Sequence, residues 1–213
     1  SPIAATGATL ELATADPERA DWSEVAAIIE EENSRLTHLV DDLLLLARMD
    51  EEALSGRQGH VSSVDLDELC LVEADRSRPV EVSVHVSSPA RVDGDVAGLT
   101  RAIRNLVDNA AAYASSSVRI EVERSGSEAV VRVIDDGPGV APEFAEQVFE
   151  RFFRVDESRA RTGGGGAGLG LAIARQVATN HGGTLALVDS SGPGAKFELR
   201  LPAGGPAPQP EDL

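Results

Sequence analysis

Two stretches within the first fifty residues follow a helical pattern of hydrophobic positions. The stretch "SPIAATGATLELA" (1–13) opens with serine and proline, an order favoured where a helix begins. Turn residues in "TADPERAD" (14–21) interrupt it, and Asp21 with Glu24 then forms the pattern of a capping box. In the helix that follows, the seam positions recur in steps of three and four: Val25, Ile29, Glu32, Leu36, Leu39, Leu43 and Leu46. This seam predicts an antiparallel helical hairpin in residues 1–50, and two chains pairing as a four-helix bundle would bury it. A hairpin packed on the rest of its own chain is the alternative.

The rest of the chain alternates between helical and strand periodicity. Residues 51–62 ("EEALSGRQGHVS") are polar with two glycines and predict a linker. Helices are predicted at 64–75 (capped near Asp65), 95–114 (capped by Asp95) and 167–183 (stopped at Gly182), and strands at 80–86, 117–124, 129–136, 184–190 and 195–202, the last four as two hairpins. This mixture predicts an α+β domain over residues 63–202, with helices on one face of a sheet. The Pro- and Gly-rich tail, 203–213, is expected to be disordered.

Composition narrows the possible partners. A formal net charge of −17 argues against nucleic acid and against direct contact with an anionic membrane surface. A hydrophobic content of 42% is enough for a core, and the lone Cys70 excludes a disulfide framework. No stretch approaches the ~18 apolar residues of a membrane span, and no signal peptide is visible. We therefore expect a soluble chain.

Three patterns carry candidate chemistry, and each has an ordinary alternative. Asn105 and Asn109 share one helical face beside a buried stripe, where amide oxygens suit Mg²⁺ that phosphate already neutralises, although an exposed polar face is commoner. "DDGPGV" (135–140) ends a strand in a sharp turn, which alone would be an ordinary turn. "GGGGAGLGLAIA" (163–174) runs from glycines into an amphipathic helix, an arrangement that suits phosphate, with a flexible linker as the alternative.

In this order, the motifs resemble the ATP-binding domain of histidine kinases, which has the GHKL (Bergerat) fold. "NLVDNAAAY" (105–113) resembles its N box, "DDGPGV" its G1 box, "FERFFR" (149–154) its F box and "GAGLGLAIA" (166–174) its G2 box. "LTHLVDDLLLLARMD" (36–50) is similar to the second helix of the dimerisation and histidine phosphotransfer hairpin. The resemblance covers essentially the whole chain and implies a two-layer α/β sandwich behind a helical hairpin.

The resemblance also implies roles for individual residues. Asn109 would ligate Mg²⁺, Asn105 would support the triphosphate, and Asp135 would accept a hydrogen bond from the adenine amino group. Further nucleotide contacts are implied for Tyr113, Gly137, Gly139, Phe152, Gly166, Gly168, Leu169 and Gly170. The segment 140–165 is similar to the ATP lid, anchored by Phe149, Phe152 and Phe153, and Arg154 is the candidate for a phosphate contact.

The implied activity is phosphoryl transfer. Gyrase-like and chaperone relatives of the fold carry a glutamate that activates water at the place of Asn105, and an amide cannot take that proton. The resemblance therefore implies a protein-histidine kinase that uses ATP and Mg²⁺, forms a homodimer through residues 1–50, and serves the receiver domain of a response regulator. Two alternatives stay open: a GHKL serine kinase of the anti-sigma type, and a non-catalytic dimerisation module with a vestigial pocket.

The phosphoacceptor histidine is expected just upstream of Ser1, because Ser1-Pro2 matches the end of the family's motif. This fragment is therefore expected not to phosphorylate itself. The histidines that the chain does contain are expected to be structural: His38, His60, His85 and His181. Ala112 replaces a basic residue frequent in the family, so nucleotide affinity is expected to be modest. The resemblance implies a cytoplasmic region of a parent protein anchored in the bacterial plasma membrane.

Overall fold

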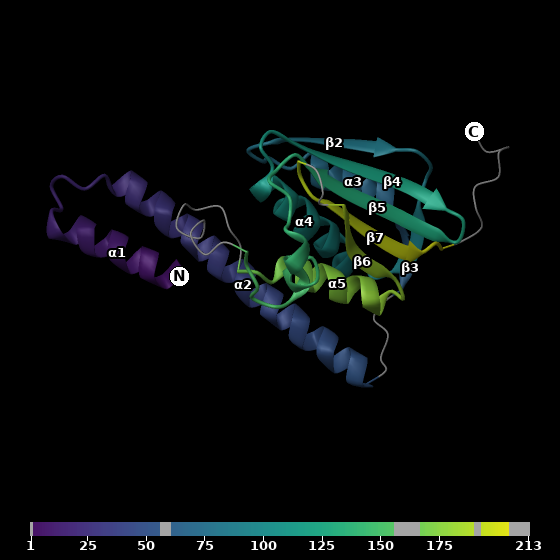
Figure 1. Cartoon of the computed structure of the whole chain (residues 1–213). Helices are drawn as coiled ribbons and strands as arrows, with labels where there is room; N and C mark the ends of the chain where they lie inside the picture. Colours follow the sequence, from purple (N-terminus) through teal and green to yellow (C-terminus); the bar gives the residue numbers. More distant parts are fainter. Residues whose placement is uncertain (1, 56–60, 156–166, 190–192, 205–213) are drawn as a thin grey trace. The chain divides into compact units, whose positions relative to one another are not determined.

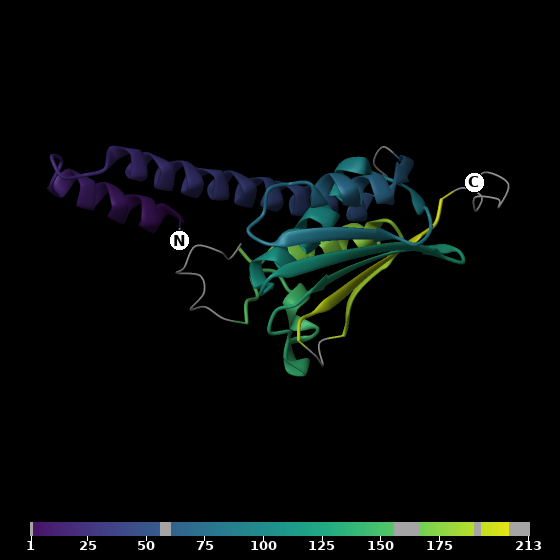
Figure 2. The same ribbon diagram turned by 90° about the horizontal axis from the view of Figure 1, so that it is seen from above.

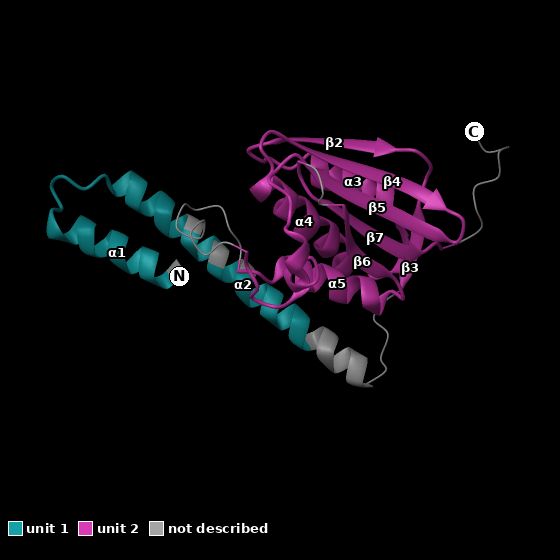
Figure 3. Cartoon of the chain, viewed as in Figure 1, with its two compact units in different colours: residues 1–47 teal, residues 48–213 magenta. Residues whose placement is uncertain are grey.

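The computed structural model of the chain describes residues 2–55, 61–155, 167–189 and 193–204. The contacts divide the chain into two compact units, residues 1–47 and 48–213 (Figure 3). Within the described residues, no helix has an apolar stretch that would let it cross a bilayer. The predicted domain boundaries at residues 50 and 62 stay a prediction.

The first unit consists of helix α1 (Pro2–Ala15) and most of helix α2 (Trp22–Ser55), which lie side by side as a hairpin (Figure 1). The predicted cap is present, because Oδ1 of Asp21 accepts hydrogen bonds from the N–H groups of Ser23 (3.0 Å) and Glu24 (3.2 Å). Helix α2 runs on to residue 55, so the first part of the predicted linker is helical. Residues 51–54 are all good helix formers, which explains the extension.

The second unit is built on a five-stranded sheet with the strand order β2-β4-β5-β7-β6. Its strands are β2 (Glu81–Val86), β4 (Ser117–Ser125), β5 (Glu128–Asp135), β6 (Thr184–Asp189) and β7 (Lys196–Pro202), and its helices are α3 (Leu66–Ala74), α4 (Val96–Tyr113) and α5 (Gly170–Asn180). Strand β2 pairs with β4 in parallel, and the other neighbours are antiparallel. The helices cover one face of the sheet (Figure 2), which confirms the predicted two-layer α/β sandwich.

Alternation along the strands decides which residues enter the core. In β4, Val118, Ile120 and Val122 are buried, whereas the residues between them point to the opposite face. Helix α4 meets this layer with the predicted apolar stripe, all of it fully buried: Ile103, Leu106, Val107 and Ala110. The N-terminus of α4 is capped as predicted, since Oδ2 of Asp95 accepts a hydrogen bond from the Gly98 N–H at 2.8 Å. The buried stripe therefore determines which face of α4 is left to contact a ligand.

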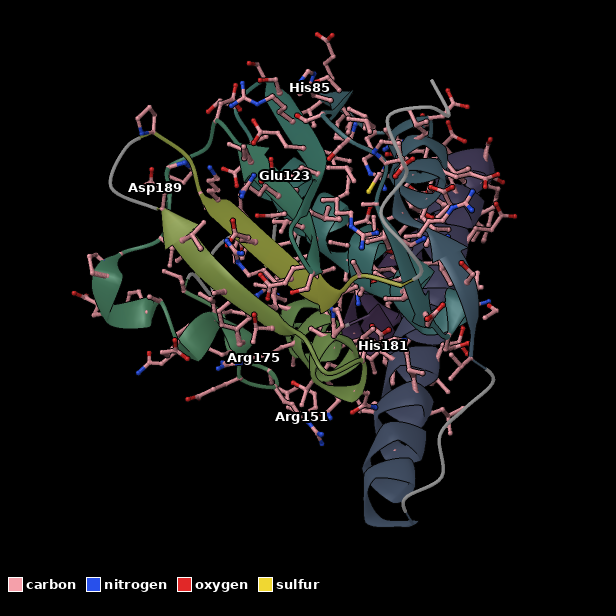
Figure 4. The ribbon with its side chains drawn as sticks, turned by 90° about the vertical axis from the view of Figure 1, so that its right-hand side faces the viewer. His85, Glu123, Arg151, Arg175, His181 and Asp189 are labelled. Atoms are coloured by element: carbon pink, nitrogen blue, oxygen red, sulfur yellow. The ribbon has the colours of Figure 1, made fainter. Side chains whose placement is uncertain are left out.

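Ion pairs connect neighbouring elements in both layers, the helices and the sheet. Glu73 of α3 is 1% exposed and pairs with Arg104 of α4, with Nη2 of Arg104 2.7 Å from Oε1 of Glu73. On the outer face of the sheet, Arg132 lies between Glu123 (2.8 Å), labelled in Figure 4, and Glu198 (2.6 Å). These ion pairs link α3 to α4 on one side and β4, β5 and β7 on the other.

A second, two-stranded sheet was not predicted. Strand β1 (Ser62–Asp65) pairs antiparallel with β3 (Arg91–Gly94). Asp65 precedes α3 as expected, but its carboxylate makes no capping hydrogen bond and instead accepts from the guanidinium of Arg91 at 3.1 Å. Ala203, at the start of the predicted disordered tail, forms a bridge with Val92, and the rest of the tail from residue 205 lies outside the described residues.

Candidate nucleotide site

A pocket of about 240 Å³ opens among α4, the turn after β5, the segment before α5, and the start of β7. Its lining residues are Asn109, Tyr113, Asp135, Pro138, Gly139, Val140, Val148, Phe153, Arg154, Val155, Leu171, Ala195 and Phe197. The pocket thus brings together five of the predicted site residues, which lie far apart in the sequence: Asn109, Tyr113, Asp135, Gly139 and Arg154.

Asp135 is the buried acid of this pocket, with 5% of its surface exposed. Its Oδ1 accepts hydrogen bonds from the N–H groups of Gly137 (2.9 Å) and Ala195 (3.2 Å). Within the described residues no hydrogen bond reaches Oδ2. Burial raises the pKa of the Asp135 carboxyl, although the two N–H groups act in the opposite direction. One carboxylate oxygen is therefore held by the backbone while the other can accept a hydrogen bond from a ligand.

The turn after Asp135 requires its glycines. A Cβ at Gly137 would lie 2.2 Å from the carbonyl oxygen of Tyr113, so no side chain fits there. Gly139 has a φ of 74°, a conformation that glycine adopts without strain. Gly139 lines the pocket and Gly137 lies behind it, where its close approach to α4 shapes the turn.

The two amides of α4 occupy different places. Asn109 lines the pocket, whereas Asn105 lies one turn earlier and is not among the lining residues. A Cβ at Gly170 would be 3.4 Å from Cγ of Asn105, so this side chain lies against the start of α5. Nδ2 of Asn105 is buried and has no hydrogen-bond partner among the described residues. An unpaired buried donor is costly unless a ligand satisfies it.

The start of α5 follows the glycine motif. Gly168 has a φ of 75°, and a Cβ there would be 2.9 Å from the carbonyl oxygen of Phe153. Leu169 is buried, and its carbonyl oxygen accepts a hydrogen bond from the Ile173 N–H at 2.9 Å. The backbone N–H groups in the first turn of a helix have no hydrogen-bond acceptor within that helix. These amides make the start of α5 suitable for an anion. Gly166 lies outside the described residues.

Aromatic residues hold the segment that precedes α5. Phe149 is buried against Phe197 with ring centroids 6.1 Å apart, and the Phe153 ring lies 5.8 Å from that of Phe144. Phe152 was predicted to contact nucleotide, but it is 61% exposed, has a φ of 67° and does not line the pocket. Its neighbour Phe153 lines the pocket instead.

Neither of the two histidines whose side chains are described, His85 and His181, lines the pocket. His181 ends α5, where Nε2 accepts a hydrogen bond from the Asp95 N–H (3.0 Å) and Nδ1 lies 2.8 Å from the Val177 carbonyl oxygen (Figure 4). A carbonyl oxygen only accepts, so Nδ1 is the donor of this pair and Nε2 is the acceptor from Asp95. His85 is exposed on β2, and the side chains of His38 and His60 are outside the described residues. His181 thus has a structural role, as predicted.

Eight lining residues were not among the predicted site residues: Pro138, Val140, Val148, Phe153, Val155, Leu171, Ala195 and Phe197. Leu171 is the half-buried position of the predicted α5 stripe, which was a usable signal. Ala195 is recognised only once the strands are paired. Its carbonyl oxygen accepts a hydrogen bond from the Asp135 N–H at 3.1 Å, and its own N–H donates to Oδ1 of Asp135 at 3.2 Å. Together these residues give the pocket apolar walls suited to a flat base.

The family profile described as "Histidine kinase-, DNA gyrase B-, and HSP90-like ATPase" matches residues 94–205. The sensor-like histidine kinase SenX3 of Mycobacterium tuberculosis is 39% identical over 181 residues, which are 81% of this chain and 43% of the relative. Sensor protein SrrB of Staphylococcus aureus is 33% identical over 84% of this chain and 31% of its own length. The chain thus spans less than half of these curated relatives.

Solved structures agree with the sequence relatives. The mycobacterial sensor histidine kinase MprB is 35% identical, with a TM-score of 0.57 over 68% of this chain and 98% of that chain. Full-length ShkA in complex with AMPPNP is 29% identical, with a TM-score of 0.72 over 87% of this chain and 39% of that chain. The chain belongs to the histidine kinase-, gyrase B- and HSP90-like ATPase family, as an ATP-binding region of the sensor histidine kinase type.

Proposed function

We propose that the chain is the catalytic region of a two-component sensor histidine kinase. It binds Mg-ATP and passes the γ-phosphoryl group to a histidine of the phosphotransfer hairpin, for relay to an aspartate of a response regulator. The observation that carries the proposal is that Asp135 and Asn109 line one pocket. The first is an acceptor for a base and the second is an oxygen ligand for a metal.

The base end of the pocket favours adenine. Oδ1 of Asp135 is occupied by the N–H groups of Gly137 and Ala195, so Oδ2 accepts a hydrogen bond from the exocyclic amino group. Guanine would place a carbonyl oxygen there, opposite a carboxylate that cannot donate. The Tyr113 ring and apolar residues such as Phe197 line the space for the purine.

The triphosphate end combines neutral and positive donors. The amides at the start of α5, the Arg154 guanidinium and the unpaired Nδ2 of Asn105 are suited to phosphate oxygens. The described residues contain no cluster of three or more His, Cys, Asp or Glu that could hold a metal. Asn109 would therefore hold Mg²⁺ through one amide oxygen, and the phosphates and water would complete the shell, which is how Mg²⁺ commonly binds. The metal supplies positive charge against the phosphates.

Asn105 favours transfer over hydrolysis. Its amide donates to phosphate but cannot remove a proton from water. ATP thus stays intact until a nucleophilic nitrogen attacks the γ-phosphorus and ADP leaves. The sensor kinase names of the relatives favour this acceptor over the serine of an anti-sigma kinase.

The hairpin supplies the proposed dimer interface. A single copy leaves large apolar side chains of α1 and α2 exposed, namely Ile3 (71%), Leu12 (77%), Leu43 (41%) and Leu44 (52%). A second copy that contributes the same two helices would cover them in a four-helix bundle. The response regulator is the further partner that this function requires.

Titration of a fluorescent ATP analogue, with and without Mg²⁺, tests the proposal. Asp135→Asn and Asn109→Ala should each weaken binding by ~1–3 kcal/mol, the cost of an unmet buried hydrogen-bonding partner. Asn109→Ala should also remove most of the dependence on Mg²⁺, whereas Asp135→Asn should leave that dependence intact. The exposed Asp93 on β3 provides the control, as Asp93→Ala should bind like the wild type. Unchanged binding in both pocket variants would refute the proposal.

A further inference from the structure

A second acid follows the adenine-binding carboxylate, and its side chain turns away from the pocket. Asp136 is not among the lining residues. Its Oδ1 accepts hydrogen bonds from three consecutive backbone N–H groups, those of Ser115 (2.8 Å), Ser116 (3.0 Å) and Ser117 (3.1 Å). Its Oδ2 also accepts from the hydroxyls of Ser116 and Ser117. All of these donors thus come from one short segment, residues 115–117.

This segment connects the two elements that carry the base-binding groups. Residues 114–116 leave the C-terminus of α4, directly after Tyr113, and Ser117 begins β4. In the sheet, Val118 of β4 is the partner of Asp135 in β5. Asp136 therefore ties the exit of the helix that carries Tyr113 to the end of the strand that carries Asp135.

A second contact closes the same corner. The backbone of Gly137 lies so close to the Tyr113 carbonyl that a Cβ would be 2.2 Å from its oxygen. Gly137 also donates its N–H to Asp135. Asp135 and Tyr113 are thus connected through Gly137 on one side and through Asp136 and the serines on the other.

We propose that Asp136 is a positioning residue, which fixes the separation between the Asp135 carboxylate and the Tyr113 ring and so sets the selectivity of the pocket for adenine. This inference rests on the proposed function. The hydrogen bonds from the serines lower the pKa of Asp136, so the group is an anion at neutral pH and attracts all of its donors. An error of about 1 Å in a positioned group costs much of a directional interaction, whereas the phosphate end, built on α5 and Asn105, does not depend on this corner.

Competition by ATP, GTP and ADP against the fluorescent ATP analogue, on the whole chain, tests the inference. Asp136→Ala should weaken ATP about tenfold, the effect of roughly 1.4 kcal/mol, and GTP less than about twofold, because GTP makes no productive bond to Asp135. The ratio of ATP to GTP affinity should fall accordingly, and the ratio of ATP to ADP affinity should stay unchanged. Asp136→Asn should restore the wild-type selectivity, since its amide oxygen can accept the same three N–H groups.

The matched control is Asp95→Ala. Asp95 is also a carboxylate that accepts a backbone N–H, at the opposite end of α4. Its loss should lower thermal stability without changing the ATP to GTP ratio. If Asp136→Ala behaves in the same way, with a lower melting temperature and unchanged selectivity, Asp136 is only structural and the inference is overturned.

Two further outcomes keep the test decisive. If Asp136→Ala does not fold, the double variant Ser116→Ala/Ser117→Ala removes only hydroxyl donors, and it should lower the ATP to GTP ratio about twofold. An unchanged ratio in a folded double variant would overturn the inference. A wild-type chain that fails to bind the ATP analogue would instead refute the proposed function, which separates the two failures.

Discussion

The two ends of the pocket are built differently. At the base end, Asp135, Gly137 and Ala195 are joined by backbone hydrogen bonds, and Asp136 holds the neighbouring loop. At the proposed phosphate end, beyond the pocket lining and against the start of α5, the buried Nδ2 of Asn105 has no partner in the described part of the chain. In the proposed complex, the described polar groups of the base end are already paired before the ligand arrives, whereas Nδ2 of Asn105 would gain its partner from the ligand.

This difference separates selectivity from affinity. Groups that are fixed in advance lose little conformational freedom on binding. The Asp135 carboxylate therefore cannot easily move to accommodate a base that lacks the matching donor. Donors left unpaired in the free protein gain most when an anion reaches them. We therefore expect substitutions at the base end to lower both the stability of the fold and the affinity for nucleotide. Substitutions at the phosphate end should lower mainly the affinity for nucleotide.

The largest expected effect is at Gly137. Gly137→Val places a side chain on the Tyr113 carbonyl, and it should cost about 3 kcal/mol or more of unfolding free energy. Chemical denaturation would measure this loss, and nucleotide binding should vanish with it. Gly126→Ala is the control, because a Cβ there meets nothing within 4 Å and only the φ of 63° opposes it. It should cost about 1 kcal/mol. A Gly137→Val chain that is as stable as this control would contradict the picture of a closed base end.

An intermediate effect is expected at Asn105. Asn105→Ala removes an unpaired buried donor, so the nucleotide-free protein should stay within about 0.5 kcal/mol of the wild type or become more stable. Mg-ATP binding should nevertheless weaken by about 1–2 kcal/mol. Denaturation without nucleotide and titration with it give the two numbers. Asn180→Ala is the control, since this exposed amide bonds only Gln176 among the described residues. A large loss of stability without nucleotide would show that Asn105 belongs to the prebuilt part.

The smallest effect concerns pH and lies wholly at the base end. The folded-state pKa of Asp136 is lowered by the serine donors, so its stabilising contribution is present above the unfolded pKa of about 3.9 and is lost as the pH falls below it. The folded-state pKa of Asp135 is raised by burial, so its contribution has the opposite sign and improves as the pH falls. Between pH 6 and pH 3, the wild type should therefore lose more stability than Asp136→Asn, as followed by thermal unfolding. Parallel pH curves for the two proteins would contradict this assignment.

The periodicity of hydrophobic residues predicted most of the helices and strands of the second unit. The stripe on α4 and the two hairpins have long, regular patterns, and the structure confirms them. The stop of α5 at Gly182 is confirmed in detail: Gly182 has a φ of 70°, and Gly183 N–H bonds the Ala178 carbonyl at 2.8 Å. Such signals are local, because each depends on residues within a few positions of one another.

The missed features depend on contacts between distant residues. Strands β1 and β3 have four residues each and mostly polar letters, so neither shows a period before the two pair. Phe152 and Phe153 are adjacent in a segment without a helical or strand period, so the sequence does not distinguish which of the two rings lines the pocket. The role of Asp136 was hidden because its partners, Ser115–Ser117, look like an ordinary polar loop and lie about twenty positions away.

The His181 imidazole connects helices α4 and α5 at one end of the pair. It spans from the last turn of α5 to the first residue before α4, and Gly94 leaves no room beside the ring, since a Cβ there would be 2.4 Å from Cδ2. At the start of α5, Gly170 lies against Asn105, which is in the middle of α4. Both ends of α5 are thus packed against α4 or the residue that precedes it, so we expect α5 to keep its position along α4 when a nucleotide binds.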